Sequence, residues 1–342
     1  MNQLPNDPGY SPPRHPPATR RHVLCLGEAL IDLMPEARSE GEFPRFWASP
    51  GGAPANVAVA VARLNQAVRF VGAVGDDAFG RLLEAALATD GVDVARLHKI
   101  AGAATPVSIV QLGDGGERQF AFYRGSGTRA ALPPQPVADD VWLDTAWLHV
   151  GSGTLGEEGE RSITLDVIRR ARRSGLGVSF DPNLRPAFWD RPETMRRVTR
   201  DVIALADVVK LSAEDLAIWH PDLPADAVKR QASSFLEQGP SLVVLTRGSK
   251  EAWWITRQTI FKAPPIPVRA VDTTGAGDAF MGALLAQLVP AGGDRGALSR
   301  LGPDAMRRMA HRCNVAAGLS CTRVGGIPSM PYAKELHWDE TP

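Results

Sequence analysis

The sequence predicts a layered α/β/α fold with a mostly parallel central sheet and a small separate β-sheet lid. Three observations lead to this prediction. Apolar, strand-like runs alternate with helical patterns along most of the chain. Several of these runs end in glycine-rich or polar turns, where α/β proteins usually place their ligand sites. A hairpin pattern that stands apart from the alternation predicts the lid.

Composition excludes several classes of function. The apolar fraction of 44% supports a large core, and 38 basic residues balance 38 acidic ones. A neutral chain of this kind is not expected to bind nucleic acid or an anionic membrane through bulk charge. The sparse cysteines, Cys25, Cys313 and Cys321, are typical of a reducing cytoplasm, and the histidines lack zinc-site spacing. We therefore expect a cytoplasmic protein whose partners are small molecules.

The two ends of the chain are expected to lie outside the folded domain. Prolines recur through residues 1–20 without an apolar block, which predicts a disordered tail and no signal peptide. Residues 336–342 are expected to form a short C-terminal tail. The folded domain should therefore span residues 21–335.

The first ordered segment leads into a glycine-rich turn. The apolar run at 22–35 predicts one buried central strand, with Asp32 where that strand runs out. Gly51 and Gly52 follow, and they would let the backbone approach a ligand. Asn56 then offers both a hydrogen-bond donor and an acceptor. A plain turn with a helix cap is the alternative interpretation.

The next pattern predicts the lid. Strand-forming residues on both sides of the glycine-rich segment 113–117 indicate a hairpin. The lid segments are placed at about 38–50 and 103–126. Closure of such a lid would exclude water from the site. Phe122 and Arg124 are candidate substrate contacts, although packing inside the lid is an alternative for Phe122.

A formal dinucleotide fingerprint occurs in the middle of the chain. Residues 151–156 read G-S-G-T-L-G after a strand-like run, which predicts a nicotinamide-dependent oxidoreductase as an alternative function. Glu157, Glu158 and Glu160 separate the glycines from the following helix, and their charges would repel a pyrophosphate. The pattern therefore favours a dinucleotide site only weakly.

A second glycine-rich turn, at 272–278, reads D-T-T-G-A-G-D and opens onto an apolar helical pattern. Glycines expose backbone N–H groups where a helix begins, and the positive end of the helix dipole favours a phosphate there. Asp278 lies in the first helical turn, where a carboxylate beside a phosphate suits a general base. A tight turn with an aspartate cap is the alternative.

These two glycine-rich turns resemble the signatures of the ribokinase-like sugar kinases, also called the PfkB family. The resemblance implies a ribokinase-like fold and transfer of the γ-phosphoryl group of ATP to a primary hydroxyl of a monosaccharide. It implies that Asp278 accepts the hydroxyl proton, and that Gly275, Ala276 and Gly277 stabilise charge on the phosphoryl oxygens. It also implies a sugar site formed by Asp32, Gly51, Gly52 and Asn56.

The substrate expectation depends on two further similarities. Ala53 stands where ribokinases have lysine, so the turn is more similar to that of fructokinases. Residues 181–186 read D-P-N-L-R-P and resemble fructokinases and 2-keto-3-deoxygluconate-type kinases. Asn183 and Arg185 are expected to hold the sugar or the phosphate, with a proline-stiffened turn as the alternative. Fructose is the first expected substrate, and a keto-acid sugar read by Arg185 and Arg124 is the second.

The same resemblance implies a nucleotide site with ATP and Mg²⁺. Family members carry N-x-x-E where this chain has Ser212 and Asp215, which still offer oxygen ligands, and Ser212 as a simple helix cap is the alternative. The implied ATP-binding residues are Lys210, Ser212, Asp215, Thr246, Gly248, Gly275, Gly277 and Asn314.

Members of this family that are activated by a monovalent cation hold it mainly with backbone carbonyls. The resemblance therefore implies a K⁺ site at Asp272, Thr274, Ser320, Arg323, Gly325 and Ser329. It also points to the lid as the surface of a homodimer. A regulator that binds sugar or nucleotide without catalysis is a third alternative, and the intact turn around Asp278 argues against it.

Overall fold

The computed structural model describes residues 21–36, 43, 45–112, 118–123, 131–133, 137–292 and 295–336. The expected N-terminal tail and nearly all of the expected C-terminal tail lie outside these residues. The lid turn at 113–117 and the candidate substrate contact Arg124 also lie outside them.

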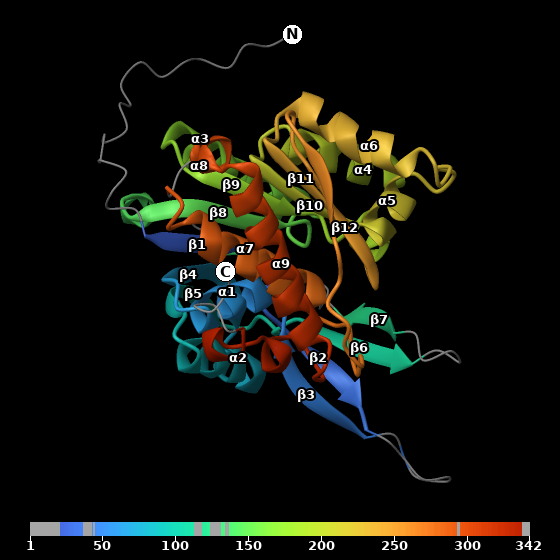
Figure 1. Cartoon of the computed structure of the whole chain (residues 1–342). Coiled ribbons are helices and arrows are strands. Elements are labelled where there is room, and N and C mark those ends of the chain that lie inside the picture. Colours follow the sequence, from blue (N-terminus) through green and yellow to red (C-terminus); the bar gives the residue numbers. More distant parts are fainter. Residues whose placement is uncertain are drawn as a thin grey trace.

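In the described part of the chain, nine strands form one large sheet in the order β13-β12-β11-β10-β9-β8-β1-β4-β5 (Figure 1). Adjacent strands from β11 to β5 in this order pair in parallel, whereas β12 pairs antiparallel with both β11 and β13. The strands are β1 (His22–Leu26), β4 (Val68–Gly75), β5 (Asp93–Ile100), β8 (Thr145–Gly151), β9 (Gly177–Asp181), β10 (Val208–Ser212), β11 (Leu242–Arg247), β12 (Lys250–Ile255) and β13 (Ile260–Ala263).

Helices cover both faces of this sheet, as the sequence predicted. One face packs against α1 (Ala53–Arg63), α2 (Ala78–Thr89), α7 (Ala276–Leu288), α8 (Ala297–Arg300) and α9 (Pro303–Ser320). The other packs against α3 (Glu158–Arg173), α4 (Pro192–Ile203), α5 (Ala213–Trp219) and α6 (Val228–Ser234). None of the described helices combines the length and apolar character that crossing a membrane requires.

Strand β1 shows why the sheet has two cores. Val23 and Cys25 join the core under α1 and α7, whereas Leu24 and Leu26 join the opposite core under α3 and α4. Successive side chains of a strand point to opposite faces, so a strand that is buried on both faces has to be apolar throughout. The continuous apolar runs that predicted parallel strands therefore reflect this two-sided burial.

A second sheet forms the lid. Its described strands lie in the order β3-β2-β6-β7, and it projects beyond the large sheet at the lower right of Figure 1. These strands are β2 (Leu30–Pro35), β3 (Phe46–Gly51), β6 (Val107–Leu112) and β7 (Arg118–Tyr123). Strand β2 pairs antiparallel with β3 and parallel with β6, and β6 and β7 form the predicted hairpin.

The predicted single strand at 22–35 is wrong, because the chain divides there into β1 and β2. Gly27 makes the break possible: its φ of 152° lies where side chains are rarely tolerated, and a Cβ there would lie 2.5 Å from Cγ of Pro54. The chain therefore leaves the large sheet and enters the lid. Asp32 consequently lies within β2 of the lid rather than at the end of a central strand.

Candidate active site

A cleft of about 900 Å³ is lined by residues of both sheets. The lid contributes Asp32 and Phe122 to its lining. The large sheet contributes residues at the carboxyl ends of its strands, such as Gly151 on β8 and Thr246 on β11. This edge of a parallel sheet is where α/β proteins usually bind ligands.

The start of α7 forms the centre of the cleft. Gly275 caps the helix with a left-handed φ of 81°, and a Cβ there would lie 2.6 Å from Cε of Met330. Glycine is therefore required at this position. Gly275, Ala276 and Gly277 all line the cleft. The first amides of a helix lack acceptors within the helix, so this turn offers donors to an anion.

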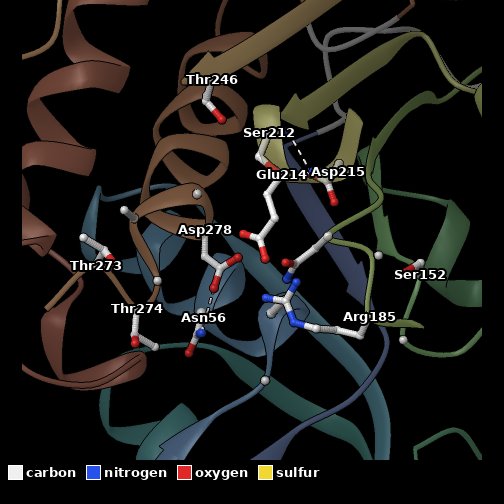
Figure 2. A pocket seen from close by; sticks show the side chains of 18 of the residues that line it. Asn56, Ser152, Arg185, Ser212, Glu214, Asp215, Thr246, Thr273, Thr274 and Asp278 are labelled. Atoms are coloured by element: carbon white, nitrogen blue, oxygen red, sulfur yellow. Dashed lines mark hydrogen bonds between the residues drawn. The ribbon is translucent and has the colours of Figure 1, made fainter. Parts of the chain in front are cut away.

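Asp278 is the third residue of α7 and is buried at the cleft. Nδ2 of Asn56, in the first turn of α1, donates to Oδ2 of Asp278 over 2.8 Å (Figure 2). Burial raises the pKa of Asp278 above its usual value, against the hydrogen bond from Asn56 and the charges of Lys210 and Arg185. The two glycine-rich turns therefore meet at one carboxylate.

Gly52 places Asn56 there. It caps α1 with a φ of 103°, and a Cβ would lie 2.6 Å from the carbonyl oxygen of Glu28. Only glycine allows this close approach of the turn to the segment that connects β1 and β2. Gly52 lines the cleft, whereas Gly51 lies behind Asp32, with its would-be Cβ 2.5 Å from Oδ2 of that carboxylate.

Asp32 is held by the lid itself. Its Oδ1 accepts a hydrogen bond from the hydroxyl of Ser108, which faces it across the β2–β6 pair. On the other side it pairs with Ser49 of β3. Asp32 is only 5% exposed, so its carboxylate has a fixed position on the lid side of the cleft.

Phe122 both lines the cleft and connects the lid to the core. Its ring meets that of Phe188 edge-on, with a centroid separation of 4.5 Å. Phe188 follows the turn that contains Asn183 and Arg185, both of which also line the cleft. Asn183 has a left-handed φ of 40°, a conformation that is uncommon outside glycine and often marks a functional turn. Figure 2 shows Arg185 reaching toward Asp278.

Ser212 and Asp215 line the cleft, and the structure shows the capping interaction that was the alternative for Ser212. Oδ2 of Asp215 accepts from the backbone N–H and the hydroxyl of Ser212 at 2.8 and 2.6 Å. Oδ1 of Asp215 accepts from the N–H of Leu184 at 2.6 Å. The Asp215 carboxylate therefore joins the start of α5 to the turn after β9.

The other predicted nucleotide residues divide into two groups. Thr246 and Gly248 line the cleft, and nothing lies within 4 Å of the position that a Cβ of Gly248 would take. Asn314 is not part of the lining, and its Nδ2 donates to the carbonyl oxygen of Pro264 at 2.7 Å. Its expected contact near the nucleotide remains a prediction.

The two loops of the predicted cation site lie side by side. The backbone N–H groups of Val271 and Asp272 donate to the carbonyl oxygen of Cys321 at 2.8 and 3.2 Å. Oδ1 and Oδ2 of Asp272 accept from the N–H groups of Thr274 and Gly325 at 2.8 and 2.7 Å. Oδ2 of Asp272 thus joins the two loops, whereas Oδ1 holds the turn within its own loop.

The remaining predicted cation positions are held by local bonds. The Ser320 hydroxyl donates to the carbonyl oxygen of Ala317, and the Ser329 hydroxyl to that of Gly326, both at 2.8 Å. The guanidinium of Arg323 pairs with Glu335. In the described residues, no three His, Cys, Asp or Glu side chains gather as a protein-only metal cage would need.

Residues 20–333 match the pfkB family carbohydrate kinase profile. The chain belongs to this family. It is therefore a phosphotransferase that acts on a sugar hydroxyl, which confirms the prediction made from the two glycine-rich turns.

Named relatives of this carbohydrate kinase include a fructokinase from Klebsiella pneumoniae, 39% identical over 315 residues that cover 92% of this chain and 97% of that protein. A solved fructokinase from Xylella fastidiosa with bound ATP has a TM-score of 0.82 at 33% identity, covering 93% and 97% of the two chains. A double mutant of Vibrio cholerae fructokinase with fructose, ADP and potassium has a TM-score of 0.78 at 31% identity, covering 94% and 98%.

The family assignment rejects the oxidoreductase alternative, and the geometry explains the misleading G-S-G-T-L-G pattern. A Cβ on Gly153 would lie 2.4 Å from Oε2 of Glu28, so this glycine makes room for a carboxylate rather than for a pyrophosphate. The expected separation of the glycines from the helix by Glu157, Glu158 and Glu160 is wrong, because α3 begins at Glu158 and only Glu157 lies between it and Gly156. The first glycines of the segment nevertheless line the cleft of the kinase.

Sequence reasoning missed four polar residues at the cleft. Glu28, Ser152 and Glu214 line it, and Asp181 lies behind it in contact with Lys210. Figure 2 shows Glu214 pointing into the same space as Asp278 and Arg185. Ser152, Asp181 and Glu214 each lie at or just beyond the carboxyl end of a strand of the large sheet. The rule that ligands gather at this edge could have identified these three.

Proposed function

We propose that this carbohydrate kinase transfers the γ-phosphoryl group of ATP to a primary hydroxyl of fructose. The observation that carries the proposal is the contact between Asn56 and Asp278 in a cleft that both sheets line. It brings a candidate sugar ligand to a candidate base at a helix N-terminus. Fructokinases that match nearly the whole chain support fructose as the acceptor.

Asp278 acts as the general base in this proposal. Its carboxylate accepts the proton of the sugar hydroxyl as the hydroxyl oxygen forms a bond to the γ-phosphorus. The bond between that phosphorus and the β–γ bridging oxygen breaks, so the products are a sugar phosphate and ADP. Burial raises the pKa of Asp278 toward neutral pH. A general base is most effective when its pKa lies near the pH at which the enzyme works.

The amides of Gly275, Ala276 and Gly277 stabilise charge on the transferring phosphoryl oxygens. They lie at the first turn of α7, which holds Asp278 as well. Donors that are already in place cost little reorganisation during the reaction. The first turn of α7 therefore holds both the phosphate-binding amides and the base in fixed positions relative to each other.

The sugar is held from both sides of the cleft. On the lid side, the carboxylate of Asp32 accepts hydrogen bonds from the sugar hydroxyls, while Asn56 and Gly52 contact the sugar from the start of α1. Asn183 and Arg185 complete the site from the turn after β9. A mixture of carboxylate, amide and exposed backbone suits a polyol.

ATP occupies the half of the cleft that is lined by Lys210, Ser212, Thr246 and Gly248. Mg²⁺ supplies charge neutralisation on the ATP phosphates when it is bound. This ion is usually held by one or two carboxylates together with substrate phosphates, and Glu214 offers such a carboxylate at the cleft. We also propose K⁺ between the loops that Asp272 connects, held by backbone carbonyls.

A keto-acid sugar is the second candidate substrate because of one observation. The Arg185 guanidinium reaches into the cleft beside Asp278, where it can pair with either a carboxylate or a phosphate (Figure 2). Replacing Arg185 with methionine separates the two substrates. A fructokinase keeps its preference for fructose, whereas a keto-acid sugar kinase loses its preference for the acid over the matching neutral sugar.

The deciding experiment compares the wild type with Asp278→Asn in a coupled assay of ADP formation. The panel contains fructose, other ketoses, aldoses and 2-keto-3-deoxy acid sugars. We expect the wild type to prefer fructose, and the variant to lose nearly all turnover while retaining fructose binding in calorimetry. Equal turnover of the two proteins would show that Asp278 is not the base. A regulator without catalysis would show binding and no turnover in either protein.

A further inference from the structure

A buried ion pair lies directly beneath the first turn of α7. Nζ of Lys210 lies 2.6 Å from Oδ2 of Asp181, and the two side chains are 5% and 3% exposed. Asp181 is the last residue of β9, and Lys210 is the middle residue of the neighbouring parallel strand β10. Lys210 faces the cleft, and Asp181 lies behind it. Burying two charges costs desolvation free energy, which a role of the pair in the reaction would explain.

The pair lies against the backbone that precedes Asp278. A Cβ on Gly277 would be 2.5 Å from Nζ of Lys210. The ammonium therefore occupies the space that any larger residue at position 277 would fill. Because Gly277 and Asp278 are consecutive residues of the first helical turn, the ammonium is fixed close to the proposed base.

The groups around this ammonium are mostly acidic. Asp181, Asp215 and Asp278 raise the pKa of Lys210 above its usual value despite burial, so the side chain remains a cation. Burial raises the pKa of Asp181, while the adjacent Lys210 ammonium opposes the rise and favours the ionised carboxylate. The nearby imidazole of His149 stays neutral, because burial and the Lys210 charge lower its pKa to about 3.

Around Asp278 itself, three charged groups come from three elements, and a neutral donor comes from a fourth. Lys210 approaches from β10, Arg185 from the turn after β9, and Glu214 from α5. Asn56 supplies a neutral donor from α1. Lys210 and Arg185 favour the ionised carboxylate, whereas burial opposes it. To accept a proton, the Asp278 carboxylate has to be ionised before the reaction. A cation that bound it directly would compete with that proton.

We propose that the ion pair of Lys210 and Asp181 keeps the carboxylate of Asp278 ionised and available to the sugar hydroxyl. Lys210 keeps the buried carboxylate ionised, and Asp181 anchors the ammonium so that the carboxylate stays free to accept the sugar proton. Lys210 and Asp181 are thus positioning residues that act through Asp278. This inference rests on the proposed function, because it takes Asp278 as the base.

Removal of each partner has an opposite effect on the base. Without Lys210, the buried Asp278 loses a favourable cation and becomes harder to ionise. Without the charge of Asp181, the cation is no longer balanced and Asp278 becomes easier to ionise. A nearby opposite charge typically moves a carboxyl pKa by about one to three units, so both changes are measurable. A pair that stabilised the fold without acting electrostatically on Asp278 would leave the pKa of this carboxylate in place in both variants.

The test is the pH profile of kcat/KM for fructose at saturating MgATP. For Lys210→Met we expect the acid limb to move up by about one unit or more, so that activity lost at neutral pH returns as pH rises. For Asp181→Asn we expect the limb to move down. Lys262→Met is the matched control, because it removes an exposed lysine that pairs with Glu251 at 3.1 Å on the edge strands. Its profile should match the wild type.

Acid limbs that stay in place in both pair variants, or that move in the same direction, overturn the inference. Calorimetric binding of fructose should be unchanged in both. If Lys210→Met does not fold in thermal melts, Asp181→Asn decides alone: a downward shift supports the inference and an unmoved limb overturns it. Failure of the proposed function looks different, since Asp278→Asn would then turn over fructose as fast as the wild type.

Discussion

The side-chain amide of Asn56 donates a 2.8 Å hydrogen bond to the carboxylate of Asp278, although 222 residues separate them in the chain. The bond joins the first turn of α1 to the first turn of α7. The two glycine-rich turns that are most informative in the sequence are therefore parts of one site. Both helices begin after a glycine with a positive φ, which sets the angle at which each side chain enters the cleft.

Replacing Asn56 with alanine should reduce kcat/KM for fructose by roughly 10- to 100-fold. A hydrogen bond to a charged group contributes about 1.5–3 kcal/mol, and each 1.4 kcal/mol corresponds to a factor of ten. Steady-state kinetics provides the measurement. Asn65→Gly is a suitable control, because Asn65 lies beyond the far end of α1 with a φ of 62° that glycine readily adopts. An Asn56→Ala enzyme as active as this control would contradict the prediction.

The pH dependence should reflect the burial of Asp278. Burial raises its pKa, and the base must be ionised to accept a proton, so activity should fall as pH decreases. The midpoint of the acid limb of kcat/KM should lie above about 3.9, the value of an exposed aspartate. Rates measured across the acid and neutral range at saturating MgATP will locate it. A limb at the ordinary aspartate value would mean that Asp278 is effectively solvated.

Much of this arrangement was predictable from the sequence, and the exceptions have physical reasons. The continuous apolar runs predicted a doubly covered sheet because parallel strands are buried on both faces. They did not reveal that residues 22–35 form two strands, since the division depends on the contact between Gly27 and Pro54 across the fold. The sequence does not predict the pairing of Asp181 with Lys210, because this pairing depends on the register of two neighbouring strands. Such tertiary pairings carry no local pattern.

The lid should hold Asp32 in place through Ser108. We expect Ser108→Ala to raise KM for fructose by roughly 3- to 10-fold with little change in kcat. This is less than the about 1.5–3 kcal/mol of a hydrogen bond to a charged group, because Ser108 holds Asp32 and does not itself bind the sugar. Ser49→Ala is the matched control. Ser49 faces Asp32 from the opposite strand, and its buried hydroxyl has no hydrogen-bond partner among the described residues. Equal KM values for the two variants would argue against a role for the Asp32–Ser108 bond.

Asp215 should contribute mainly to stability. Its carboxylate accepts two hydrogen bonds from Ser212 at the start of α5 and one from Leu184 in the turn after β9. Asp215→Ala should therefore destabilise the fold by about 3 kcal/mol and lower the melting temperature. The neighbouring Glu214→Ala provides the contrast. It should leave the melting temperature unchanged while weakening activity at limiting Mg²⁺, because Glu214 points into the cleft. Thermal melts and magnesium titrations separate the two effects. Similar melting temperatures for both variants would contradict the assignment.

Asp272 should transmit the effect of a monovalent cation to the phosphate site. Its two carboxylate oxygens hold the N–H groups of Thr274 and Gly325, so the loop that begins α7 and the loop after α9 share one anchor. We expect the wild type to turn over faster in potassium chloride than in tetramethylammonium chloride of equal ionic strength, because a cation bound between the loops would order the amides that meet the phosphate. Asp272→Ala leaves both N–H groups unpaired and should abolish this difference between the salts. Initial rates in the two salts are the measurement, and a wild type that does not distinguish them would remove K⁺ from the proposed chemistry.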